Sequence, residues 1–196
     1  MKLPLFPLNT VLFPGCTLDL QIFEARYLDM IGRCMKQGEG FGVVCILEGQ
    51  EVGEAANRFA AIGCEALISD WQQRPNGLLG IRVEGGRRFH VSSAQVLRDQ
   101  LTVADVEWLT DEPELPLLPE HADLAALLNA LAEHPMVQGL GMGGVVDGQQ
   151  ALANQLSYLL PFHINEKLQL LTLNYPGERL AFLQGLLDHL QGESIA

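Results

Sequence analysis

The amino-acid sequence predicts an α+β protein in which an antiparallel β-barrel or sandwich is followed by a bundle of α-helices. The first hundred residues hold short apolar runs separated by Gly, Asn and Pro. Regularly spaced short strands with turn residues between them are typical of barrels and sandwiches. Beyond residue 123 the apolar residues recur at helical spacing instead. A length of 196 residues suits one large domain or two small ones.

Several short apolar runs in the first half are expected to form strands. They cover residues 41–49, 64–71, 78–86, 87–96 and 101–109. The sequence Arg-Pro-Asn-Gly at 74–77 predicts a turn between two of them, because Asn and Gly accept the positive φ that a tight hairpin needs. One helix is predicted within this β-rich part, over residues 23–38. Its apolar stripe is formed by Tyr27, Met30, Ile31 and Cys34, and Gly38 is expected to end it.

Residues 111–123 contain three prolines and five acidic residues, a composition that breaks both helix and strand. We therefore expect a barrel domain over 1–110, a linker over 111–123 and a helical bundle over 124–196. Four helices are expected in the bundle. The first carries Leu124, Leu127, Leu128 and Leu131 on one face. The second stops or kinks at Pro161, the third is capped by Asn165, and the fourth ends before Gly192.

The net charge of −12 is concentrated in the second half of the chain. Residues 1–98 hold ten basic and ten acidic side chains, and residues 99–196 hold two basic and fourteen acidic ones. Such a surface repels nucleic acids and anionic membranes and tolerates basic or unfolded protein partners. Because no apolar run approaches the roughly 20 residues of a membrane span, and no signal peptide is evident, we expect a soluble cytoplasmic protein.

The motifs of common catalytic and cofactor sites are absent, or they occur without the secondary structure and neighbouring residues that such sites require. Residues 139–144, Gly-Leu-Gly-Met-Gly-Gly, match a dinucleotide fingerprint, but a helix precedes them where that fold needs a strand, so we expect an interhelix loop. Ser157 lies inside a predicted helix, and nothing local lowers the pKa of Lys167, so a serine-lysine dyad is not expected. The four cysteines and five histidines lack metal-ligand spacing. We expect no catalytic residue, metal or cofactor, and mostly buried cysteines.

Two short stretches are candidates for binding, and each has a structural alternative. At the start of the first helix, Glu24 can complement the helix dipole, and Arg26 can pair with Asp29 or another carboxylate. The stretch Gly-Gly-Arg-Arg-Phe-His-Val at 85–91 can stack on a base or a peptide, or it can form a turn followed by an edge strand. The candidate peptide-binding residues are Phe23, Glu24, Arg26, Tyr27, Arg88 and Phe89.

Six segments, in order, resemble the N-terminal substrate-binding domain of Lon proteases. They are LPLFPLNTVLFPG (3–15), FEARY (23–27), FGVV (41–44), VGEAA (52–56), GGRRFHV (85–91) and LPFHINEKLQLLTLNYPGERLAFLQGLL (160–187). The resemblance implies a PUA-like β-barrel with a helical bundle behind it. It also implies that the Leu-Phe-Pro repeat forms the first barrel strand, where prolines suit an edge, and that FEARY opens a helix crossing the barrel.

The resemblance also carries expectations about function. Full Lon proteases continue into an ATPase module and a serine-lysine peptidase, for which 196 residues leave no room, so the chain is similar to the stand-alone Lon-domain proteins of bacteria, grouped with peptidase S16. It implies no ATP hydrolysis and no peptide cleavage. The expected function is binding of protein segments or unfolded polypeptides, as an adaptor for which Lon protease is a candidate partner.

Two alternatives stay open beside this expectation. PUA-like barrels often bind RNA, and five of the twelve basic residues lie between Arg74 and Arg98. The neutral charge of the barrel half argues against RNA. A small-molecule site in the barrel cleft is the second alternative, although no nucleophile is paired with a base.

For the expected polypeptide partner, an apolar cleft between barrel and bundle is the expected place for an extended segment. The sequence leaves open the identity of the partner, the oligomeric state and the isomers of the Leu-Phe-Pro prolines.

Overall fold

The computed structural model describes the backbone of residues 1–195 and the side chains of residues 1–194. The chain divides into two compact units, Met1–Leu109 and the segment from Thr110 onward. The first unit consists mainly of strands with one α-helix, and the second consists of helices, so the predicted α+β class is confirmed.

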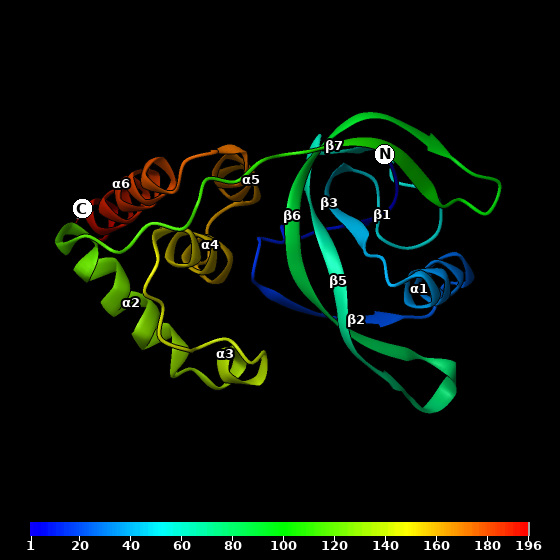
Figure 1. The fold of residues 1–196 in the computed structure, drawn as a ribbon, viewed down its shortest axis with the longest axis horizontal. Coiled ribbons are helices and arrows are strands. Elements are labelled where there is room, and N and C mark those ends of the chain that lie inside the picture. Colours follow the sequence, from blue (N-terminus) through cyan, green and yellow to red (C-terminus); the bar gives the residue numbers. More distant parts are fainter. Residues whose placement is uncertain (196) are drawn as a thin grey trace. The chain divides into compact units, whose positions relative to one another are not determined.

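The strands of the first unit pair into a closed ring (Figure 1). They are β1 (Lys2–Leu8), β2 (Thr17–Ile22), β3 (Phe41–Glu48), β4 (Arg58–Phe59), β5 (Ile62–Gln73), β6 (Leu79–Val96) and β7 (Thr102–Trp108). The order β1-β7-β6-β5-β3 returns to β1 through a parallel β1–β3 pairing, and the other pairings are antiparallel. Closure removes the exposed edges of an open sheet for the five strands of this ring, whereas β2 and β4 each pair with one strand of it. The expected barrel is therefore present.

β6 is one strand of 18 residues where two strands were expected. Its first part pairs with β2 and β5, and its second part pairs with β5 and β7. Gly85 suggested a turn, but it serves a close approach of the backbone: its N–H and C=O bond to Cys16 and Gly15, both at 2.8 Å. A Cβ at Gly85 would overlap the carbonyl of Phe13. The glycine allows another segment to cross the strand without breaking it.

β1 lies between β7 and β3, but each of its paired residues has a single partner strand: Lys2–Pro4 pair with β7, and Leu5–Leu8 pair with β3. Pro4 and Pro7 therefore each lie where one strand, and not two, is paired, which is compatible with the edge character expected for them. The change of partner falls between Pro4 and Leu5. The second Leu-Phe-Pro, at 12–14, lies outside the strands, with its leucine and phenylalanine buried. All described peptide bonds are trans.

The Phe89 ring fills the interior of the barrel and is fully buried. Its core cluster contains Leu3, Leu5, Val44, Phe89, Ala104 and Val106. Gly42 and Gly63 make room for the ring: a Cβ on either would lie 2.7 or 2.6 Å from Phe89 Cζ. Because real Cβ atoms do not approach so closely, the Phe89 ring fits in the core only if residues 42 and 63 have no side chain.

The helix α1 (Ala25–Gln37) has the predicted buried stripe, and Gly38, at φ 67°, ends it as expected. The turn predicted at 74–77 is also present, as the 3₁₀ turn η1 (Pro75–Gly77) with Asn76 at φ 71°. Figure 1 shows β5 and β6 running on together as a long twisted hairpin that η1 closes.

The second unit contains five α-helices within the described residues, one more than expected. They are α2 (Ala122–Ala132), α3 (Pro135–Gly139), α4 (Gln149–Leu159), α5 (Ile164–Thr172) and α6 (Pro176–Ile195). The helix cap predicted at Asn165 was wrong, because His163 is the N-cap and its N–H donates to Glu166 at 2.9 Å. α6 also continues through Gly192, which lies inside the helix. Residues 139–144 form the end of α3 and the following interhelix loop, as predicted.

The acidic segment after residue 110 is attached to the start of α4. The Glu114 carboxylate accepts from the N–H groups of Gln150 and Ala151, at 2.7 and 3.1 Å. The side chain of Gln149 donates to the carbonyl of Pro116 at 2.9 Å. An acid at a helix N-terminus satisfies otherwise unpaired N–H groups and complements the dipole.

We predict that Gly63→Ala destabilises the barrel by about 1–3 kcal/mol, because the added methyl group collides with Phe89 and the Val43 carbonyl. Urea unfolding followed by circular dichroism measures this loss. The control is Gly32→Ala in α1, where nothing lies within 4 Å and alanine favours helix, so unchanged or slightly higher stability is expected. Equal effects of the two substitutions would contradict the steric explanation.

Candidate polypeptide-binding surface

The carboxylate of Glu24, the residue preceding α1, connects the helix start to a neighbouring loop. Its Oε1 accepts from the Gly53 N–H at 2.7 Å, and its Oε2 accepts from the Arg26 guanidinium at 2.8 Å. Glu24 makes no side-chain cap to its own helix. The carboxylate that pairs with Arg26 is therefore Glu24, and the pair positions the loop that carries Gly53.

Arg26 extends this connection to the β6–β7 turn. Its side chain is buried and donates to the Gln100 carbonyl at 2.7 Å, while the guanidinium lies 4.6 Å from the centre of the Tyr27 ring. Gln100 in turn accepts from the Ala55 N–H at 3.2 Å. A buried charge needs such full pairing to be tolerated. Three segments that are distant in the sequence are fixed together here.

Beside this ion pair lies a pocket of about 170 Å³, which we call the Phe23 pocket. Phe23 and Val52 line it with 53% and 52% of their surface exposed. The remaining apolar lining comes from Phe6, Leu8, Leu20, Ile22 and Tyr27. Tyr27 and Phe6 stack at 4.0 Å between ring centres, and burial raises the pKa of the Tyr27 phenol. The pocket has a rigid aromatic lining and two exposed apolar side chains.

A larger hollow of about 510 Å³ lies between the end of α1 and β5. Met35, Leu67 and Trp71 line it and are 41–54% exposed. Sequence reasoning did not single out these three residues. Trp71 follows an apolar run on a strand whose end extends into a hairpin, so its exposure depends on the length of that hairpin, which the sequence pattern does not give.

A third hollow, of about 430 Å³, is lined by the polar faces of β2, β5 and β6. Asp19 and Arg82 form a two-point ion pair across it, at 2.7 and 2.8 Å. Hydrogen bonding from Arg82 lowers the pKa of Asp19 below its usual value of 3.8. Arg82 is one of the five basic residues between Arg74 and Arg98, so this contact offsets part of the charge that an RNA site would need.

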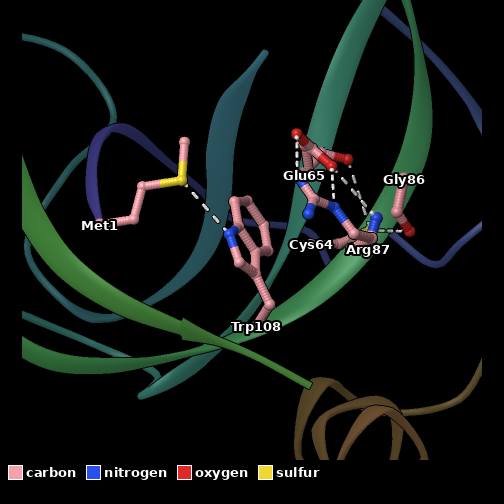
Figure 2. A network of polar contacts seen from close by, with 6 residues as sticks. All are labelled: Met1, Cys64, Glu65, Gly86, Arg87 and Trp108. Carbon is pink, nitrogen blue, oxygen red and sulfur yellow. Dashed lines mark hydrogen bonds and ion pairs between the residues drawn. The ribbon is translucent and has the colours of Figure 1, made fainter. Parts of the chain in front are cut away.

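The basic stretch at 85–91 is also largely engaged in contacts, and Figure 2 shows those of Gly86 and Arg87. The Arg87 guanidinium bonds to Glu65 at 3.1 Å and lies 3.8 Å from the Trp108 ring centre. On the other side of Trp108, its Nε1 donates to the Met1 sulfur at 3.3 Å. Arg88 is fully buried. Pairing and burial therefore occupy three of the five basic side chains that could have formed an RNA-binding face.

The six candidate residues separate into two groups. Phe23, Glu24 and Tyr27 line the Phe23 pocket, and Arg26 supports it through Glu24. Arg88 and Phe89 do not line this pocket, and both are fully buried. Phe23 is the aromatic of the set with a large exposed surface, and Glu24 and Arg26 hold the site in position.

Within the described residues no helix is long and apolar enough to cross a membrane. The same residues contain no group of three or more His, Cys, Asp or Glu side chains that could hold a metal ion. All four cysteines are buried, as predicted, and present as free thiols. Burial raises the pKa of Cys34 and Cys45, which keeps these thiols protonated and weakly nucleophilic.

We predict that Tyr27→Ala lowers the free energy of unfolding by about 3–5 kcal/mol, because it removes a buried ring stacked on Phe6. The matched variant Phe23→Ala is expected to change stability by less than about 0.5 kcal/mol, because half of this ring is in solvent. Urea unfolding of both variants tests the distinction. A loss of several kcal/mol for Phe23→Ala would show that it belongs to the core.

Comparisons with known proteins agree with this architecture. A solved structure titled as a Lon N-terminal domain protein from Xanthomonas campestris is 35% identical, covers 94% of this chain and 98% of its own, and superposes with a TM-score of 0.76. The N-terminal domain of a Mycobacterium avium complex Lon protease shares the fold, with a TM-score of 0.62, 20% identity, and 93% and 96% of the two chains covered.

The curated relatives of the chain include a Lon protease from Flavobacterium johnsoniae, which is 23% identical over 188 residues. The match spans 91% of this chain and 23% of that protein, so the chain corresponds to about a quarter of its relative. Residues 2–189 match the family described as the ATP-dependent protease La (LON) substrate-binding domain. The chain therefore belongs to the Lon substrate-binding domain family.

Proposed function

We propose that this chain is a non-catalytic module that binds unfolded protein segments through the apolar surface of its barrel. The observation that carries the proposal is the Phe23 pocket, where two half-exposed apolar side chains stand on a rigid aromatic lining. Exposed aromatic groups that are already ordered lose little entropy on binding and act as anchors. Folded proteins bury the apolar side chains that such anchors would contact, whereas unfolded chains expose them.

The position of Phe23 and Val52 is fixed before any partner arrives. Glu24 follows Phe23 directly and bonds to the N–H of Gly53, the residue after Val52. One carboxylate therefore sets the spacing of the two anchors, and Arg26 holds that carboxylate. In this proposal Phe23 and Val52 contact the bound segment, Tyr27 forms the floor, and Glu24 and Arg26 are positioning residues.

The proposal includes neither ATP hydrolysis nor peptide cleavage, and it assigns the chain an adaptor role. The family match over residues 2–189 concerns the substrate-binding domain. An adaptor would hold an unfolded segment and present it to a separate enzyme, for which a Lon protease is the candidate. The acidic second half, with two basic and fourteen acidic residues from position 99 onward, favours basic partners over nucleic acids.

We predict that the protein binds a permanently unfolded basic reporter, reduced lysozyme with its cysteines blocked by the uncharged carbamidomethyl group, and binds the native disulfide-bonded form much more weakly. Fluorescence anisotropy of the labelled reporter measures the affinity. Val52→Ser is expected to weaken binding about three- to tenfold, because it removes an apolar anchor.

The matched control is Val145→Ser, which changes a 94% exposed valine in the loop before α4 and is expected to leave the affinity unchanged. Absence of reporter binding by the unmodified protein would contradict the proposed function. Equal losses for the two variants would contradict the assignment of the pocket.

A further inference from the structure

The Phe23 pocket runs along an open strand edge. β2 pairs with β6 from Thr17–Glu84 to Ile22–Leu79, and no strand among residues 1–195 pairs with its other side. The stretch Asp19–Ile22 lines the pocket. An open edge presents a row of backbone N–H and C=O groups with which another extended chain can form a ladder of hydrogen bonds. The pocket and the edge therefore offer apolar side chains and backbone hydrogen-bonding groups on one surface.

We propose that an unfolded segment binds here as an added β-strand on Asp19–Ile22, with a bulky apolar side chain in the Phe23 pocket and a Lys or Arg beside Glu51. This inference rests on the proposed function and names the class of segment recognised and the way it is held. Main-chain hydrogen bonds supply affinity for any extended sequence, and the pocket selects among side chains.

The geometry of the site supports an extended occupant. The side chains of an added strand alternate, so one of every two can enter a pocket beside the edge while the next points away. A volume of about 170 Å³ suits a single bulky side chain rather than a packed helix face. Phe23, directly after the last residue of β2, lies where the strand edge ends and can cover the inserted side chain.

The charge of the lining of the Phe23 pocket favours a basic residue next to the inserted side chain of the bound segment. The lining contains three carboxylates, Asp19, Glu24 and Glu51, and no basic side chain. Asp19 is paired with Arg82, and Glu24 is paired with Arg26. Glu51 accepts a hydrogen bond from the Asn9 N–H at 2.7 Å and has no ion pair within the described part of the chain. Of the three carboxylates, that of Glu51 is therefore the one whose negative charge can attract a basic side chain of the bound segment.

The test uses four synthetic peptides that compete with the unfolded reporter. The first alternates Val or Phe with Lys over nine residues, and the second has Glu in place of Lys. The third and fourth carry the Lys sequence with backbone N-methyl groups on one strand edge or on the other. Because an added strand pairs through one edge only, N-methylation of one edge is expected to weaken binding at least about tenfold, and methylation of the other to have little effect.

The charge component is tested with Glu51→Gln, which keeps the Oε1 acceptor for Asn9 and removes the negative charge. The Lys peptide is expected to bind about tenfold more tightly than the Glu peptide at low salt, and Glu51→Gln is expected to remove most of that difference. Hydrogen exchange by NMR supplies an independent readout: alternate amides of Asp19–Ile22 should gain protection when the Lys peptide binds.

The outcomes separate the two proposals. Reporter binding that the peptides displace equally, whichever edge is methylated, would overturn the added strand and leave the proposed function standing. A Lys preference that survives Glu51→Gln would overturn the role of Glu51. If neither the reporter nor any peptide binds, both proposals fail. Loss of affinity on one edge only, with alternate protection of the β2 amides, would support the inference.

Discussion

The structure of the barrel depends on the close packing of one aromatic ring against two glycines. Phe89 on β6 occupies space that a side chain at Gly42 on β3 or Gly63 on β5 would otherwise fill. In the closed ring β5 lies between β3 and β6, and a side chain at either glycine would displace Phe89 from the core that these strands enclose. Phe89 itself lies on the longest strand, β6, which pairs with β2, β5 and β7 along its 18 residues.

On this framework the Glu24–Arg26 pair positions the candidate binding site. The pair joins the start of α1, the loop carrying Val52 and Gly53, and the β6–β7 turn at Gln100. The buried Arg26 guanidinium contacts Glu24, the Gln100 carbonyl and the Tyr27 ring, which compensates for its removal from water. In the proposed function this arrangement keeps Phe23 and Val52 in position, so that less conformational entropy is lost when a segment binds.

The chemistry of the barrel surface supports the proposal of a polypeptide partner over RNA. The basic residues that looked promising as a group are engaged separately, Arg82 with Asp19 and Arg87 with Glu65 and Trp108. The Phe23 pocket and the hollow between α1 and β5 instead combine exposed apolar side chains with carboxylates. Such surfaces attract apolar segments that carry positive charge and repel phosphate.

The sequence alone determined the α+β class, the α1 stripe, the turn at 74–77 and the family resemblance, because these depend on local periodicity and on residues with strong backbone preferences. It also named Phe23, Glu24, Arg26 and Tyr27 as candidate binding residues, and their role stays a prediction. Only the tertiary structure showed that Phe89 is core, that Gly85 is a crossing point rather than a turn, and that β2 has an open edge beside the pocket. These features arise from contacts between residues far apart in the chain. The neighbouring sequence does not tell whether a glycine forms a turn or lets another segment cross, or whether an aromatic residue is exposed or packs in the core.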